Sequence, residues 1–329
     1  MTVSIRPATP ADFPAIAGVM NLVWPDRPVS VESLEQDESE LSASSLPLKR
    51  GLLLAEQGGL PVGLAEYGQS PGMYHPRKFH AAVNVLPSAT GQGVGRALTG
   101  RLWAELAPHD PLSVIAGTQD DHPRGLDFLA RQGFSEVLRY YDLWLDLPAF
   151  DFAPFLAREA LPDGYRLTSY AELGGNEEAQ RRIYGLWTEL RADVPRPDKA
   201  TPVLFEQFAR RFHDPAHLHL LPAGYLLAVH QSSGELVATS ELWRSDGGHL
   251  NTGLTGVQRA HRRRGLALAL KLAALRYARS LGAPQIRTNT ASDNAGMLGI
   301  NESLGFVRQP AWVEMRWEET AGGADGRSL

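Results

Sequence analysis

The sequence predicts an α/β protein that contains two copies of one domain. Segments with strand-like alternation follow segments with helical periodicity along both halves, which indicates helices layered on a sheet. The halves also match in register at a constant offset of 172 residues, which pairs Gly93 with Gly265, Leu98 with Leu270 and Gly133-Phe134 with Gly305-Phe306. Upstream, 62–66 matches 237–241 at an offset of 175, so loop lengths differ there. A constant offset over about forty residues indicates an internal duplication.

The first half predicts a strand-rich domain with four helices. The pair Gly58-Gly59 separates two apolar runs and predicts a hairpin, and Thr9 is a candidate cap for the first helix. The strands are expected over 3–7, 51–56, 61–67, 79–86, 113–116 and 137–147, and the helices over 9–24, within 25–47, over 96–106 and over 125–132.

The second half repeats this order. We expect strands over 165–168, 226–230, 235–243, 250–257, 285–290 and 311–317, and helices over 176–190, 202–213, 266–278 and 297–304. The predicted boundaries are an N-terminal domain at 1–148, a proline-rich linker at 149–163, a C-terminal domain at 164–318 and a disordered tail at 319–329.

Composition restricts the class of protein. The 329 residues are 43% hydrophobic and 21% charged, with a net charge of -5 and a pI near 6.1, which argues against a nucleic-acid or membrane-surface binder. The absence of cysteine excludes disulfides, thiolate metal sites and a cysteine nucleophile. No apolar run fits a signal peptide or a membrane span, so a cytoplasmic protein, monomer or homodimer, is expected.

The segment from Thr252 to Ala278 has the strongest functional pattern. An extended run leads into the basic turn 262–265, Arg-Arg-Arg-Gly, and then into a long apolar-periodic helix. Free amides and the positive end of the helix dipole attract anions, and the arginines add charge. The turn therefore predicts a site for a phosphate-bearing ligand. Neither the dinucleotide fingerprint nor the nucleotide-triphosphate loop matches it.

Three motifs in the second half resemble those of the GCN5-related N-acetyltransferase (GNAT) superfamily. Val257 is followed by Arg262-Arg263-Arg264-Gly265-Leu266-Ala267, and Asn294 precedes a helix that ends in Leu304-Gly305-Phe306. The opening 5–12, Ile-Arg-Pro-Ala-Thr-Pro-Ala-Asp, is also typical of that superfamily. Its tandem members include mycothiol synthase-like enzymes. The resemblance implies a central mixed β-sheet flanked by helices in each half.

The resemblance further implies acetyl-CoA as cosubstrate, without a metal, with its pyrophosphate on the basic turn. The implied cofactor-binding residues are Val257, Arg262, Arg263, Arg264, Gly265, Leu266, Ala267 and Asn294, with Val85, Gly91, Gly93, Val94 and Gly95 as first-half counterparts. Small residues such as Gly265 and Ala267 let the backbone approach a phosphate closely.

The two halves differ in charge at these positions. At the offset of 172, Arg262 corresponds to Thr90 and Arg264 to Gln92, while Asn294 corresponds to His122. Charge-assisted contacts to phosphate are the stronger ones. We therefore expect catalysis in the C-terminal half, and weaker cofactor binding or a structural role for the N-terminal half.

Acetyl transfer to an amine requires a base. The carboxylate Glu241 is the first candidate, and His249 and His261 are weaker ones. The tyrosine that is often the general acid of the superfamily is replaced by Asn301, and by Leu129 in the first half. The expected acceptor is the primary amine of a small molecule. A protein or peptide N-acetyltransferase and a non-catalytic acyl-CoA sensor are the alternatives.

Overall fold

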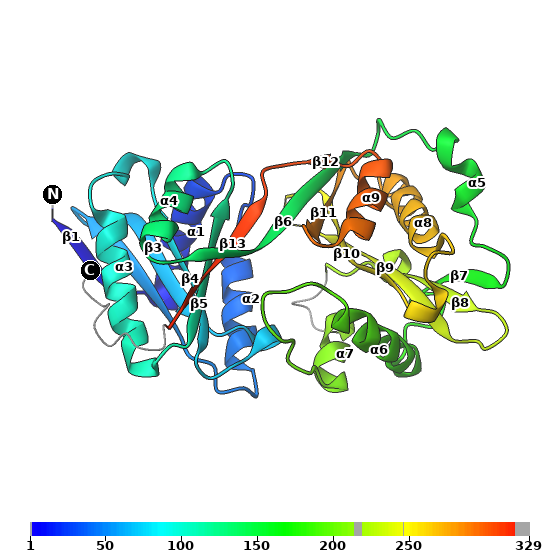
Figure 1. The fold of residues 1–329 in the computed structure, drawn as a ribbon, viewed down its shortest axis with the longest axis horizontal. Helices are drawn as coiled ribbons and strands as arrows, with labels where there is room; N and C mark the ends of the chain where they lie inside the picture. The colour runs from blue at the N-terminus through cyan, green and yellow to red at the C-terminus, as the bar shows by residue number, and fades with distance from the viewer. Residues whose placement is uncertain (1, 214–218, 246, 320–329) are drawn as a thin grey trace. The chain divides into compact units, whose positions relative to one another are not determined.

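The computed structural model of the chain describes residues 2–213, 219–245 and 247–319, and Figure 1 shows its ribbon. It divides into two compact units. Unit 1 comprises the chain up to Arg139, Pro197–Thr201 and the chain from Trp312, and unit 2 comprises Tyr140–Arg196 and Pro202–Ala311. Within the predicted tail, residues 320–329 lie outside the described residues.

Unit 1 contains a mixed sheet in the order β1-β2-β3-β4-β5-β13. Its strands are β1 (Val3–Pro7), β2 (Arg50–Gln57), β3 (Leu60–Gly68), β4 (Lys78–Val85), β5 (Ser113–Gln119) and β13 (Trp312–Glu318). Neighbours are antiparallel except β4 and β5, which are parallel. Gly58 and Gly59 form the tight β2–β3 turn with φ angles of 60° and 80°, a conformation that favours glycine.

Helices cover both faces of this sheet. They are α1 (Phe13–Val23), α2 (Val31–Ser42), α3 (Val94–Leu106) and α4 (Pro123–Arg131). Alternation along β3 explains the two cores: Leu64 packs with α1 residues such as Ile16, whereas Ala65 packs with α3 residues such as Leu98.

Unit 2 repeats the arrangement with the order β6-β11-β10-β9-β8-β7. Its strands are β6 (Ser135–Asp146, of which 140–146 belong to unit 2), β7 (Tyr165–Ser169), β8 (Leu226–His230), β9 (Leu236–Arg244), β10 (Leu250–Val257) and β11 (Gln285–Ala291), with the short β12 (Val307–Arg308) on β6. As in unit 1, the described pairs are antiparallel except one, which here is β10 with β11.

The helices of unit 2 are α5 (Leu156–Glu159), α6 (Glu177–Ala192), α7 (Phe205–His213), α8 (Leu266–Ser280) and α9 (Ala295–Ser303). Leu242 of β9 packs in the core with α8, and the next residue, Trp243, packs against the core of α6 and α7. The predicted α/β class, with a mixed sheet between helices in each copy, is confirmed.

The last strand of each sequence repeat joins the sheet formed by the other repeat: the end of β6, from the first repeat, lies in unit 2, and β13, from the second repeat, lies in unit 1. Residues 140–146 of β6 pair with Gln285–Ala291 of β11, and β13 pairs with β5 over its whole length. The compact units therefore differ from the predicted ranges 1–148 and 164–318. Both last strands have similar apolar alternation, so the sequence does not reveal which sheet receives which strand.

Two connecting segments are also part of the packed units. In the predicted linker 149–163, Phe150 and Phe152 are buried in the core with α8. Segment 197–201, between α6 and α7, belongs to unit 1, where Asp198 pairs with Lys78 and, at 3.2 Å, with Arg316. Among the described residues, every helix is too short or too polar to span a bilayer.

Candidate functional site

The strands β10 and β11 of unit 2 separate soon after they begin. Their described register pairs Leu250 with Ile286 and Asn251 with Arg287, and does not continue beyond these residues. On its other side β10 stays paired with β9 as far as Val257, with a bulge between Thr252 and Thr255. One edge of β10 is therefore open where the strands diverge, which leaves backbone donors and acceptors for a ligand.

The basic turn follows β10 and ends at the start of α8. Gly265 is the N-cap, in the left-handed region with φ 85°, and a Cβ there would meet nothing within 4 Å. The first helical bond runs from the Ala269 amide to the Gly265 carbonyl at 3.0 Å, so the amides of 265–268 have no intrahelical carbonyl partner. Arg263 also lies in the left-handed region, with φ 59°, which strains a residue with a Cβ. A strained turn with free amides is typical of an anion site.

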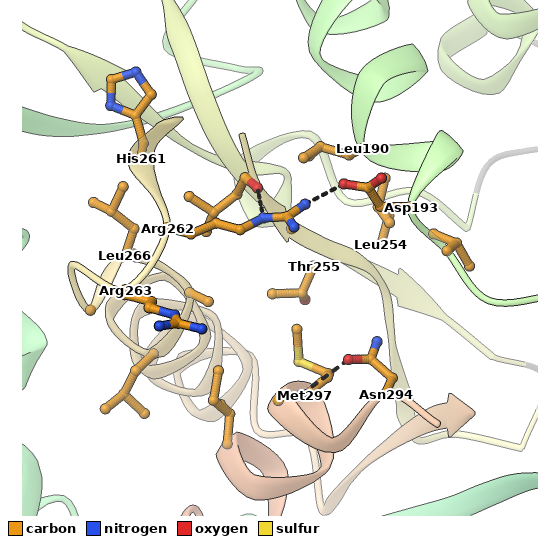
Figure 2. Close-up of a pocket in the computed structure, with 18 residues that line it drawn as sticks. Leu190, Asp193, Leu254, Thr255, His261, Arg262, Arg263, Leu266, Asn294 and Met297 are labelled. Atoms are coloured by element: carbon orange, nitrogen blue, oxygen red, sulfur yellow. Dashed lines mark hydrogen bonds and ion pairs between the residues drawn. The ribbon is translucent and has the colours of Figure 1, made fainter. Parts of the chain in front are cut away.

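A pocket of about 510 Å³ lies over this turn (Figure 2). Its walls come from the end of α6, from β10, from the turn with the first residues of α8, and from the start of α9. The predicted residues that line it are Val257, Arg262, Arg263, Gly265, Leu266, Ala267 and Asn294. Arg264 is exposed and does not line the pocket.

Arg262 is positioned by the end of α6. Its Nε donates to the Val257 carbonyl at 3.0 Å, and its guanidinium pairs with Asp193, the C-cap of α6 (Figure 2). Arg259 pairs with the same carboxylate. Hydrogen bonds from Arg259 and Arg262 lower the pKa of Asp193 to about 2, so it stays ionised at neutral pH. Arg263 adds a third guanidinium to the turn without pairing with Asp193, so the turn has an excess of positive charge.

Asn294 and Asn301 have different roles at the two ends of α9. Asn294 caps the helix, since its Oδ1 accepts from the Met297 amide at 3.3 Å, and its side chain borders the pocket. Asn301 is fully buried and its Nδ2 donates to Thr290 Oγ1 at 3.0 Å. At neutral pH a buried carboxamide has no proton to transfer, so Asn301 does not replace a tyrosine general acid.

Glu241 lies on β9 beneath the bulge of β10, outside the pocket lining. Its side chain is 1% exposed. Oε1 accepts from the Tyr225 hydroxyl at 3.0 Å, and Oε2 accepts from Arg211 at 2.8 Å and from Trp243 Nε1 at 3.1 Å. Burial, and secondarily the Glu241 charge, raises the pKa of Tyr225 well above its usual value.

Only glycine fits the bulge above this carboxylate. A Cβ on Gly253 would lie 2.5 Å from Trp243 Nε1 and 2.6 Å from Glu241 Oε2. The guanidinium of Arg211 lies 5.0 Å from the Trp243 ring and 5.5 Å from the Trp187 ring. Sequence reasoning missed Arg211, although a carboxylate on a buried strand signals that a cation must accompany it.

The two histidine candidates lie beyond opposite ends of β10. His261 lines the pocket beside the basic turn, and its Nδ1 lies 2.9 Å from the Tyr165 hydroxyl. His249 precedes the other end of the strand, with its ring 4.6 Å from that of Trp144. Burial lowers the pKa of both, so both are expected to be neutral at pH 7.

The first unit repeats the glycine turn without its charge. Gly91 and Gly93 have φ angles of 79° and 86°, and α3 begins directly afterwards at Val94. The side chains of the turn bond locally: Thr90 Oγ1 donates to the Leu86 carbonyl at 3.2 Å and Gln92 Nε2 to the Ser88 carbonyl at 2.8 Å. The other two counterparts lie beside the turn, where a Cβ on Gly95 would be 3.7 Å from Val85.

Comparison with known proteins identifies the family. The family model described as the acetyltransferase (GNAT) family matches residues 16–134 and 183–306, once in each repeat. The chain belongs to the GNAT acetyltransferase family. It is therefore an acyltransferase, and members of this family generally use acetyl-CoA.

Among curated relatives, the GNAT chain is similar to mycothiol acetyltransferases. It is 30% identical to that of Thermobispora bispora, over 65% of this chain and 69% of the relative. It is 27% identical to that of Pseudarthrobacter chlorophenolicus, over 69% of this chain and 66% of the relative. The matches thus span about two thirds of each relative.

Solved structures agree on the tandem fold. A tandem GNAT protein from the clavulanic acid biosynthesis pathway superposes with a TM-score of 0.74 at 22% identity, covering 98% of this chain and all of that chain. A GCN5-related N-acetyltransferase from Sphaerobacter thermophilus gives a TM-score of 0.71 at 20% identity, covering 96% and 95%.

Proposed function

We propose that unit 2 binds acetyl-CoA on the basic turn and transfers the acetyl group to the primary amine of a small molecule. The observation that carries this proposal is the pocket at the start of α8. It gathers seven residues predicted from the sequence, from β10, from the turn with the start of α8 and from the start of α9, around one cavity. A cavity of about 510 Å³ is in the size range of small-molecule sites.

The chemistry of the lining suits a diphosphate. The free amides of 265–268 and the positive end of α8 attract phosphate oxygens, and the side chains of Arg262 and Arg263 add positive charge. Asp193 keeps Arg262 at the edge of the pocket until an anion competes for it. The open edge of β10 offers further backbone partners, and we expect the Val257 amide to polarise the thioester carbonyl.

The same site accounts for acetyl transfer. The amine nitrogen attacks the carbonyl carbon, a C–N bond forms, the C–S bond breaks, and the thiol leaves as a thiolate. Thiols have a pKa near 8.5, so the leaving group departs without a general acid, which agrees with the buried Asn301. Glu241, whose carboxylate pairs with Arg211, is the proposed base, and it takes the proton from the amine through water.

We expect the acceptor beside the bulge, under α6 and α7. Trp187, Arg211 and Trp243 present aromatic and cationic groups there. Tyr184 belongs instead to the core, since its hydroxyl donates to the Val203 carbonyl at 2.6 Å. The similarity of this chain to proteins named mycothiol acetyltransferases supports a small-molecule acceptor for this chain.

A free-thiol release assay with acetyl-CoA and a panel of amines and peptides tests the function. Turnover with small amines supports the proposal, and faster turnover with peptides would favour a protein acetyltransferase. Arg262→Ala removes a charge-assisted contact of about 1.5–3 kcal/mol, so we expect acetyl-CoA to bind about 10- to 150-fold more weakly.

Arg264→Ala is the matched control. It removes the same charge from the same turn, at a residue that does not line the pocket. Its effect should be several-fold smaller than that of Arg262→Ala. If Arg262→Ala leaves activity intact while Gly93→Val abolishes it, catalysis belongs to unit 1 and the assignment to unit 2 is wrong.

A further inference from the structure

The first unit has a tryptophan where the second has its pocket. Trp24 is the C-cap of α1, as Asp193 is the C-cap of α6. It is 9% exposed, its Nε1 donates to Asn84 Oδ1 at 2.8 Å, and its ring stacks on His122 at 5.0 Å with an interplanar angle of 22°. The indole is therefore held by a buried hydrogen bond on one side and a stacked ring on the other.

The residues that hold Trp24 correspond to residues that line the pocket of unit 2. At the repeat offset of 172, Asn84 matches Gly256 and His122 matches Asn294. Gly256, Asn294 and Asp193 all border that pocket. In unit 1 the Trp24 side chain contacts both Asn84 and His122, so it lies between the end of the first helix, the central strand and the start of the last helix.

Further aromatic packing restrains the indole. Trp312 of β13 meets the Trp24 ring edge-on at 5.5 Å, and Arg27 lies over the Trp312 ring at 5.2 Å. Trp312 in turn covers Gly117 of β5, where a Cβ would lie 2.5 Å from its Nε1. Moving Trp24 aside would break its buried hydrogen bond and expose aromatic surface.

We propose that Trp24 determines which of the two repeats takes the cofactor. Its ring fills the slot of unit 1, by which we mean the space that corresponds to the pocket of unit 2. The chain then binds one acetyl-CoA, in unit 2. This inference rests on the proposed function and goes beyond it: the absence of arginines at 90–92 weakens attraction of the diphosphate, whereas Trp24 removes the space for the rest of the ligand.

The decisive measurement is the binding stoichiometry of the full chain, by native mass spectrometry and titration calorimetry with acetyl-CoA. We expect one equivalent, which Gly265→Val abolishes and Gly93→Val does not. Two equivalents of similar affinity would overturn the role of Trp24 and leave the proposed function intact. One equivalent that is lost with Gly93→Val alone would also overturn it. No binding at all would instead reject the proposed function.

Hydrogen exchange of the unmodified protein locates the ligand without a substitution. Acetyl-CoA should slow exchange at 262–270 by more than tenfold and leave 90–98 unchanged, and slowed exchange at both would contradict the proposal. Trp24→Ala should gain a second, weaker equivalent at millimolar acetyl-CoA, whereas Trp24→Phe, which keeps a ring in the slot, should not. A folded Trp24→Ala protein that still binds one equivalent would show that Trp24 is not the determinant.

Discussion

Replacing Glu241 by glutamine should destabilise unit 2 by about 3 kcal/mol. The substitution keeps the size of the side chain and removes the charge from an ion pair whose carboxylate is 1% exposed and whose Arg211 partner is 19% exposed. Breaking a buried pair costs about 3–5 kcal/mol, because one charge is left uncompensated. Because Arg211 is partly exposed, we expect a loss of stability at the lower end of this range. The new amide also faces two donors, from Arg211 and Trp243.

The first repeat supplies a matched control in Glu66, which occupies the corresponding strand position. Burial, and then the nearby Asp37 charge, raises its pKa. A raised carboxyl pKa means that the folded state favours the protonated form, so the penalty is absent at low pH and grows as the pH rises through the folded pKa. Glu66→Gln should therefore be neutral near pH 4 and stabilising at pH 8, opposite in sign to Glu241→Gln.

The stability of each unit is measured separately by guanidinium unfolding with hydrogen exchange as the probe. A global probe would combine the two units into one transition. Peptides from β9 and α8 report on unit 2, and peptides from β3 and α3 report on unit 1. A loss below about 1 kcal/mol for Glu241→Gln, or equal effects of the two substitutions at pH 8, would refute the assignment of a buried, charge-dependent pair.

Three further substitutions test other features. Arg263→Gly relieves a left-handed residue and should stabilise the chain by about 1 kcal/mol in thermal unfolding while weakening acetyl-CoA binding; unchanged stability would argue against strain. Lys271 is buried and its pKa falls to about 8 from 10.5, a difference worth about 3 kcal/mol. A lowered lysine pKa penalises the folded state at low pH. Lys271→Met should therefore raise the free energy of unfolding at pH 7, and this increase should fade between pH 8 and 10.5. Gly253→Ala places a Cβ 2.5 Å from Trp243 and should cost about 1–3 kcal/mol by the same unfolding measurement, with loss of activity.

The sequence predicted features that local chemistry determines. The expected strand 250–257 and the hairpin at Gly58-Gly59 appear as expected. The glycine turn and its arginines were also identifiable from the sequence. The backbone at position 265 has a positive φ, which favours glycine, and the arginines are its immediate neighbours in the chain.

The features that the sequence did not reveal depend on contacts between distant residues. Arg211 lies 30 residues from Glu241, and Trp24 lies 60 residues from Asn84. Nothing in the local pattern around Trp24 distinguishes a tryptophan that fills a ligand slot from one in an ordinary core. The difference between the copies lies in contacts that form only in the folded chain, where Trp24 meets Asn84 and His122.

The exchange of last strands has a consequence for synthesis of the chain. On the ribosome, β5 emerges complete at Gln119, but its neighbour β13 begins at Trp312, about 190 residues later. At roughly 5–20 residues per second, unit 1 waits on the order of 10–40 s with one edge of its sheet unpaired. Such an edge is a template for pairing with other chains. The nascent protein should therefore depend on chaperones during this interval, and a fragment cut at residue 148 should aggregate instead of folding as half an enzyme.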